Sequence, residues 1–523
     1  MTTRYAPSGM VSSVDHLATA AGVAQLRVGG SAADAAVATS AVLAVTTPHM
    51  CGMGGDLLAL VHEGDGPPMV LNASGRAGSG ADPERLLSEG HQVMPFIGDI
   101  RTVPVPGCVD GWLELHARFG RLPLDAVLAP AIGYAADGFP VGPLLSMMLT
   151  AVVDADGAAD YRPGGRKLRT GQRCRRPGAA RALQAIARQG RAGFYGGEFG
   201  EGLLTLGQGE YRPEDLDRSQ ADWVMPLGRR VWGHDVWTVP PNSQGYLVLA
   251  AALLADGLDL PTDPDDERWA HLLAECAKQA GYDRPDRLHE HADPEVLLDG
   301  RELDRRRGRI DPDRANPVAG PAADGGTIYL AAVDDRRQGV SLIQSNASGF
   351  GSHLFEPLTG INLHNRGLGF SLAPGHPARY GPGRRPPHTL SPTLVTRPDG
   401  SLRAVAGSMG GDAQPQIVLQ VLARLLHGGQ RPGQAVGAPR FVLANHDGEH
   451  GFDTWAAPAR LGVDVEAEAP AQWIAGLEAR GHSVRSVPGA NHAMGHAHVI
   501  DVAGDMLAGA HDPREPQGSA GGW

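Results

Sequence analysis

The sequence predicts an α+β protein in which helices pack around stacked sheets. Helical patterns dominate the front half of the chain, and alternating strand patterns dominate the back half. The chain is also long enough, because 523 residues with 42% hydrophobic content can bury one large core or two to three ordinary ones. We therefore expect a globular protein with both kinds of element in its core.

The front half begins with an alanine-rich segment that is typical of a buried helix. It follows Ser31 and Asp34, which have the spacing of a capping box, and it runs to Pro48. Further elements follow along the chain: strands over 56–63 and 68–74, and helices over 107–120 and 123–138.

Residues 283–326 separate the two halves. They are rich in charge, proline and glycine, which predicts a mobile linker. The back half then alternates between short elements: strands over 327–334 and 339–346, a strand pair over 391–407, a helix over 417–429 and a hairpin over 496–512.

Composition and charge exclude several classes of partner. The net charge is -12, and no lysine or arginine run alternates with aromatic residues, so we expect no nucleic acid. No stretch reaches the ~18 uninterrupted apolar residues of a membrane helix, and the first residues lack the apolar core of a signal peptide. We therefore expect a cytoplasmic protein with no membrane partner.

The residues that commonly bind metals do not form a familiar pattern. The four cysteines are far apart and form no CxxC pair, so neither a disulfide framework nor a zinc site is indicated. His492, His496 and His498 lie close together, but they come without the nearby carboxylates or thiolates that a metal site uses. We expect no metal and no organic cofactor.

The dipeptide Gly326-Thr327 stands where the charged segment meets a strand. Cleavage between the two residues would give Thr327 a free α-amine with a pKa near ~8, which can act as a general base beside the threonine's own hydroxyl. Glycine before the bond leaves room for the hydroxyl to reach the carbonyl. The alternative is an ordinary loop ending at a strand start.

A second glycine pair, Gly410-Gly411, lies in the segment AGSMGGDAQPQ at a strand-to-helix turn. Backbone N–H groups at such a turn can point at a developing oxyanion without Cβ atoms in the way. A tight turn with no catalytic role is the alternative.

These residues belong to a set of motifs that resembles the γ-glutamyltransferase family of N-terminal-nucleophile hydrolases. The motifs occur in the family order over nearly the whole chain: GGSAADAAVATSAVLAVTTPHM, PPNSQG, HLLAECAKQAGYDR, SNASGFGS, GINLHNRGLGFSL, GPGRRPPHTLSPTLV and GSMGG. The resemblance implies a four-layer αββα sandwich. It also implies a proenzyme that cleaves itself into a large subunit, residues 1–326, and a small subunit, residues 327–523.

The resemblance assigns roles to matching residues. Thr327 takes the position of the nucleophile, and Ser345 that of a hydroxyl that hydrogen-bonds the nucleophile. Gly410 and Gly411 match the oxyanion pair. For Ser345, the alternative is a strand-end serine bonded to its own backbone.

The chain departs from the family where transferases bind the glutamyl group. The family's arginine for the α-carboxylate aligns with Ser74, two residues before Arg76. Its asparagine and aspartate for the α-ammonium align with Ala347, beside Asn346, and with Gly369. Its serine pair reads His388-Thr389.

We therefore expect a binding site rich in positive or donor groups and without a carboxylate. Its candidates are Arg76, Asn346, Arg366, His388 and Thr389. A guanidinium suits a substrate carboxylate, which predicts a compact, anionic amide. For Arg366, the alternative is an ion pair that only orders its loop.

Taken together, these residues predict an autoprocessing threonine amidohydrolase, and the motifs resemble the amidohydrolase branch that includes oxamate amidohydrolases. Three alternatives remain: a γ-glutamyltransferase or glutathione hydrolase with a rearranged clamp, a cephalosporin or glutaryl acylase or an oxalyl C–C hydrolase, and an uncleaved, non-catalytic binding protein. The partners expected are a small-molecule amide and the two subunits of one precursor, and a dimer of such pairs stays open.

Overall fold

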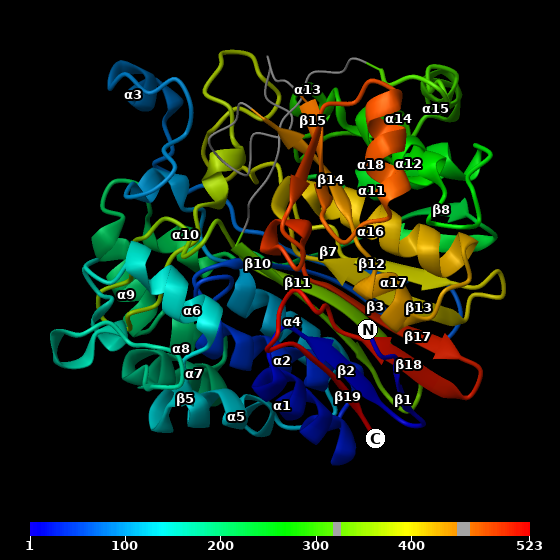
Figure 1. Ribbon diagram of the computed structural model, residues 1–523. Coiled ribbons are helices and arrows are strands. Elements are labelled where there is room, and N and C mark those ends of the chain that lie inside the picture. The colour runs from blue at the N-terminus through cyan, green and yellow to red at the C-terminus, as the bar shows by residue number, and fades with distance from the viewer. Residues whose placement is uncertain (317–325, 447–460) are drawn as a thin grey trace.

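The computed structural model describes residues 1–316, 326–446 and 461–523. Two seven-stranded sheets lie face to face at its centre, and helices cover their outer faces (Figure 1). This is the αββα sandwich expected for an N-terminal-nucleophile hydrolase, so the predicted fold class is confirmed. Among the described helices, none is long and apolar enough to cross a membrane.

Both sheets combine strands from the two sides of the Gly326–Thr327 bond. The first has the order β1 (Arg4–Ala6), β18 (Met506–Ala510), β17 (Ala497–Ala503), β13 (Leu402–Ser408), β12 (Thr393–Thr396), β9 (His234–Thr238), β8 (Leu227–Val231). The second has the order β19 (Ser519–Gly522), β2 (Met10–Ser13), β10 (Gly326–Val333), β11 (Gly339–Ala347), β3 (Asp56–His62), β4 (Met69–Ala73), β7 (Asp222–Val224). Two small sheets add β14 (Phe441–Asn445), β15 (Leu461–Glu466) and β16 (Val484–Val487), and β5 (Phe139–Pro140) with β6 (Arg173–Cys174).

Alternation along the central strands creates three apolar layers. On β10, Tyr329 and Ala331 face the first sheet, whereas Ile328 and Leu330 face the helices. The helices of this layer are α1 (His16–Arg27), α2 (Ala32–Thr46), α4 (Cys108–Phe119), α5 (Leu124–Asp137), α7 (Pro177–Gln189), α8 (Arg191–Tyr195) and α9 (Glu198–Leu206). As predicted, Ser31 and Asp34 form a capping box at the start of α2, which is buried along its whole length.

The opposite helical layer covers the first sheet. Its members are α11 (Tyr246–Asp256), α12 (Glu267–Gly281), α14 (Pro294–Leu297), α15 (Gly300–Arg307), α16 (Gln414–Leu422), α17 (Pro432–Gly437) and α18 (Ala471–Ala479). The predicted helix at 417–429 begins earlier, at Gln414, and continues as a π-helical turn over Ala423–His427. Short helices at the margins complete the set: α3 (Pro83–Ser88), α6 (Pro143–Met148), α10 (Pro213–Asp217) and α13 (Arg284–Arg287).

The predicted mobile linker is wrong for residues 283–316, which form α13, α14 and α15 against the core. Its charges are not simply solvated. Arg306 is buried, because its guanidinium is paired with Asp283 and Glu302. Composition alone predicts that charged residues such as these are exposed to solvent. Here they pair with one another, which allows the segment to pack against the core. The rest of the predicted linker, residues 317–325, lies outside the described residues.

Candidate active site

Thr327 and Ser345 face each other across the first pairs of β10 and β11. The two strands are antiparallel, and the register pairs Thr327 with Ser345 just after an irregularity at Gly326. Directly opposed residues bring their side chains to one face of the sheet. The Thr327 Oγ1 and Ser345 Oγ atoms are 2.8 Å apart, and both residues are fully buried.

The Ser345 hydroxyl has further partners besides Thr327. Its Oγ accepts from the backbone N–H of Ala347 at 2.9 Å and from Nη2 of Arg366 at 2.9 Å. Ser345 Oγ is thus the point at which the Arg366 guanidinium contacts the hydroxyl pair.

Arg366, at the start of the short 3₁₀ helix η5 (Arg366–Gly369), connects this hydroxyl pair to two further groups. Nη1 donates to Thr389 Oγ1 at 3.0 Å, and Nε donates to Asp56 Oδ2 at 3.3 Å. The ion pair that was the alternative interpretation of Arg366 is thus present. The same guanidinium also contacts the hydroxyl beside Thr327, so pairing with an acid does not remove it from the site.

Asp56, the first residue of β3, is the buried anion at the centre of this network. Its Oδ2 is 2.6 Å from Nε2 of His388 and 3.5 Å from Nδ1 of His364. Burial alone would raise the pKa of the Asp56 carboxyl, but the facing His388 and Arg366 hold that pKa well below its usual range. The expectation of a site without a carboxylate is corrected by this residue.

His388 is turned toward Asp56. Its Nδ1 accepts from the backbone N–H of Leu390 at 3.2 Å, so Nε2 carries the ring proton and donates it to Asp56. Burial lowers the pKa of His388 to about 4, which agrees with a neutral ring. His388 therefore orients the carboxylate rather than presenting a positive charge to a substrate.

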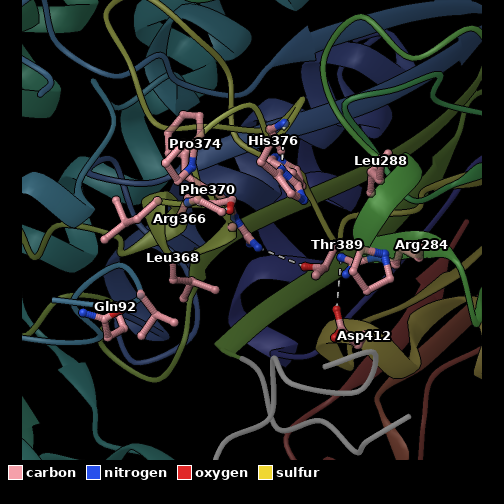
Figure 2. Close-up of a pocket in the computed structure, with 18 of the residues that line it drawn as sticks. Gln92, Arg284, Leu288, Arg366, Leu368, Phe370, Pro374, His376, Thr389 and Asp412 are labelled. Atoms are coloured by element: carbon pink, nitrogen blue, oxygen red, sulfur yellow. Dashed lines mark hydrogen bonds and ion pairs between the residues drawn. The ribbon is translucent and has the colours of Figure 1, made fainter. Parts of the chain in front are cut away.

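A cavity of about 600 Å³ opens beside this network (Figure 2). Arg366 and Thr389 line it together with a second ion pair, in which Nη2 of Arg284 is 3.2 Å from Oδ1 of Asp412. In Figure 2 this ion pair lies on the far side of Thr389 from Arg366. Much of the remaining wall is apolar and includes Leu87, Val93, Leu288, Leu368, Phe370, Leu372 and Pro374.

The Gly410-Gly411 turn borders the same region. Gly410 has φ +141° and Gly411 φ +53°, values that favour glycine, and a Cβ on Gly410 would lie 2.8 Å from Cδ1 of Ile417. Nε2 of Gln244 donates to the carbonyls of both Thr389 and Gly411, which ties the turn to the cavity wall. In the described part of the chain, the N–H groups of Gly410 and Gly411 have no acceptor.

Two of the predicted binding residues lie apart from the cavity lining. Arg76 is paired with Asp222 on β7. The side-chain amide of Asn346 donates to the backbone carbonyl of Pro48 at 2.9 Å. The structure thus brings Thr327, Ser345, Arg366, His388 and Thr389 into one network and leaves Arg76 and Asn346 outside it.

Sequence reasoning missed four residues of the site: Asp56, Arg284, His364 and Asp412. Asp56 ends the segment CGMGGD, which attracts attention only through its glycines. A carboxylate at the first position of a fully buried strand is the signal that would have identified it. Arg284 lay in the segment interpreted as a linker.

Known proteins resemble this chain over nearly its whole length. The family model described as gamma-glutamyltranspeptidase matches residues 18–522. The chain is 34% identical to the oxamate amidohydrolase proenzyme of Klebsiella pneumoniae, with 98% of both chains covered. It is 33% identical to a glutathione hydrolase-like proenzyme of Bacillus subtilis, with 97% of both covered. Among solved structures, cephalosporin acylase from Bacillus halodurans superposes with a TM-score of 0.90 at 33% identity, covering 100% of this chain and 97% of that one.

Proposed function

This chain belongs to the gamma-glutamyltranspeptidase family of N-terminal-nucleophile hydrolases, and from that premise we propose that it is an autoprocessing threonine amidohydrolase. Thr327 is the nucleophile in this proposal, and the precursor is cleaved between Gly326 and Thr327. The observation that carries it is the 2.8 Å contact between Thr327 Oγ1 and Ser345 Oγ, within a buried network that ends at Arg366 and Asp56.

Self-cleavage would use the same hydroxyl as catalysis. Thr327 Oγ1 attacks the Gly326 carbonyl, the chain shifts from the amide to an ester, and water hydrolyses the ester. The large subunit, residues 1–326, and the small subunit, residues 327–523, would then stay together. Support comes from the two central sheets, since each contains strands from both sides of the bond.

In the mature enzyme, the freed α-amine of Thr327 takes the hydroxyl proton as Oγ1 attacks the substrate amide. The amine returns that proton to the leaving nitrogen, and water releases the acyl group from the enzyme. Gly410 and Gly411 are the proposed oxyanion donors, supported by N–H groups that have no acceptor in the described residues. The Ser345 hydroxyl, whose Oγ is 2.8 Å from Oγ1, positions the nucleophile in this proposal.

The substrate we propose is an amide of a small carboxylated acyl group, of the oxamate kind. Support comes from Arg366 and Arg284 in the cavity wall, with the Thr389 hydroxyl between them, because guanidinium groups suit carboxylates. The Klebsiella pneumoniae relative is named for this substrate.

A second candidate, hydrolysis or transfer of γ-glutamyl groups, is favoured by the Arg284–Asp412 pair. The sequence indicated no site for an amino-acid zwitterion, but this pair places a cation and an anion together on the cavity wall, and Asp412 directly follows the glycine turn. The ammonium group of a zwitterionic donor would pair with Asp412, and its carboxylate would pair with Arg284.

Intact mass spectrometry of the wild type, Thr327→Ala and Thr327→Ser tests the nucleophile. We expect the wild type to split into two fragments with a new N-terminus at Thr327, Thr327→Ala to stay whole, and Thr327→Ser to split more slowly. If the wild type and Thr327→Ser both stay whole at neutral pH, the proposal fails and a non-catalytic binding protein becomes the better interpretation.

Ammonia release from oxamate, compared with p-nitroaniline release from L-γ-glutamyl-p-nitroanilide, separates the two substrate classes. We expect turnover of oxamate. Turnover of the glutamyl substrate, accelerated by glycylglycine, would replace the first candidate with the second. Thr327→Ala is the control in both assays.

A further inference from the structure

Outside the active site, the described residues contain two clusters in which two histidines and a glutamate bring possible ligand atoms within 4.8 Å of one another. One consists of His271, Glu275 and His482, and the other of His492, His496 and Glu515. They have the same donor set, but their surroundings differ.

The first cluster already contains a cation. Nζ of Lys278 is 2.7 Å from Oε1 of Glu275 and 3.2 Å from Nδ1 of His482. Nδ1 of His271 is hydrogen-bonded to Nε2 of His482, and Nε2 of His271 is hydrogen-bonded to the carbonyl of Asp311. The glutamate of this cluster is therefore already paired with a buried ammonium group.

The second cluster has the same ligands without a lysine. Nδ1 of His492 and Nε2 of His496 are hydrogen-bonded to each other at 2.8 Å, so a bound ion would displace the shared proton and separate the two nitrogens to about 3.3 Å. His496 is fully buried, and Glu515 is only 5% exposed. In the described part of the chain, Glu515 accepts one backbone hydrogen bond, from Gln517 at 3.1 Å, and has no ion pair.

We propose that His492, His496 and Glu515 bind a divalent transition-metal ion, with Zn²⁺ as the best match to two imidazoles and one carboxylate. A water molecule would complete a tetrahedral set. The sequence argued against a metal here because the histidines came without carboxylates. The fold supplies one by bringing Glu515, from the loop after β18, against the turn before β17.

The position of the site indicates a structural rather than a reacting metal. His492 begins the 3₁₀ turn η8 (His492–Met494), and the carbonyl of His496 accepts from the N–H of Met409 at 3.3 Å. A Cβ on Gly495 would lie 2.5 Å from the carbonyl of Met409, so the two turns are in close contact. An ion bound here would hold the turn that leads into Gly410.

Metal analysis of the full chain, purified without chelators and dialysed, tests this proposal by inductively coupled plasma mass spectrometry. We expect about one zinc per chain in the wild type and less than about a fifth of that in Glu515→Gln and His492→Asn. His291→Asn, which removes an exposed histidine, is the matched control and should keep the wild-type content. Far-UV circular dichroism verifies that each variant is folded.

Titration of the metal-free protein with Co²⁺ gives a second, independent readout. Visible absorption bands of a four-coordinate ion, together with a rise in melting temperature, are expected for the wild type and the control, and at least about tenfold weaker binding for the two cluster variants. Substoichiometric zinc with no Co²⁺ spectrum would overturn the proposal, as would equal binding by the wild type and both cluster variants. Neither result depends on whether Thr327 is the nucleophile.

Discussion

Two buried ionic networks of this protein are built from similar groups but differ in the groups that they contact at their edges. The network of Asp56, His364, Arg366 and His388 ends at the hydroxyls of Ser345 and Thr389, beside a cavity. The network of His271, Glu275, Lys278 and His482 ends at the backbone of residues 311–316, where Lys278 donates to the carbonyl of Asn316 and Glu275 accepts from its amide groups.

The comparison shows that burial and shifted pKa values do not by themselves mark an active site. Burial lowers the pKa of His388 to about 4, and burial with the facing Lys278 lowers that of His482 to about 2. The first network contacts a candidate nucleophile, and its Arg366 lines the cavity beside it. Among the described residues, the second network contacts residues 311–316 and no candidate nucleophile, so contact with a reactive hydroxyl is the better guide to function here.

The largest effect should come from breaking the second network. In Glu275→Gln the buried Lys278 loses its carboxylate, which should cost about 3–5 kcal/mol of unfolding free energy. Thermal or urea unfolding measures the loss, and the turnover of the folded fraction should be unchanged. Glu198→Gln, which breaks an exposed pair with Arg181, should cost less than about 1 kcal/mol. Equal losses for the two variants would contradict the prediction.

Breaking the first network should reduce activity instead. Asp56→Asn removes the carboxylate that orients Arg366, and we expect kcat to fall about 100-fold, or about 2.7 kcal/mol of transition-state stabilisation. Intact mass determination separates failed maturation from slow turnover. Asp110→Asn, in a buried aspartate paired with Arg191, is the matched control, and a comparable fall there would mean that any buried pair matters equally.

The pH dependence of the unfolding free energy gives a further test of the second network. His482 is faced by His271, Glu275, Lys278 and Arg480, and its folded pKa of about 2 lies below the ordinary 6.5. Between these values the unfolded chain binds a proton that the folded chain does not, so stability falls as the pH falls. Replacing His482 with Gln should remove up to about 1.4 kcal/mol per pH unit from that slope between pH 3 and 6. An unchanged slope would show that His482 is already protonated in the fold.

The smallest effect should follow removal of the hydroxyl between the first network and Thr327. Ser345→Ala should lower kcat about fivefold, or about 1 kcal/mol, because one hydrogen bond to Thr327 Oγ1 is lost. Ser341→Ala is the matched control on the same strand, since its hydroxyl contacts Tyr329 instead. Equal kcat values for Ser345→Ala and the wild type would remove Ser345 from the proposed mechanism.

Much of the molecule followed from local sequence. The Ser31 capping box and the alanine pattern defined α2, and strand-like runs at 327–334 and 339–346 defined β10 and β11. The motif resemblance pointed to the αββα fold and to the pairing of Thr327 with Ser345, which are 18 residues apart in one hairpin. Such features depend on backbone preference and on which face is apolar, and both are encoded within a few residues.

The tertiary structure alone decided how the charges are arranged. Asp56 and Arg366 are 310 residues apart, and they meet because the β11–β3 pairing brings the start of β3 beside Ser345. The same holds for Arg284 with Asp412, and for Glu515 with His492 and His496. Sequence determined which groups this protein carries. The order of strands in its sheets determined which of them are buried together, because ionic partners are selected by distance in space and have no period along the chain.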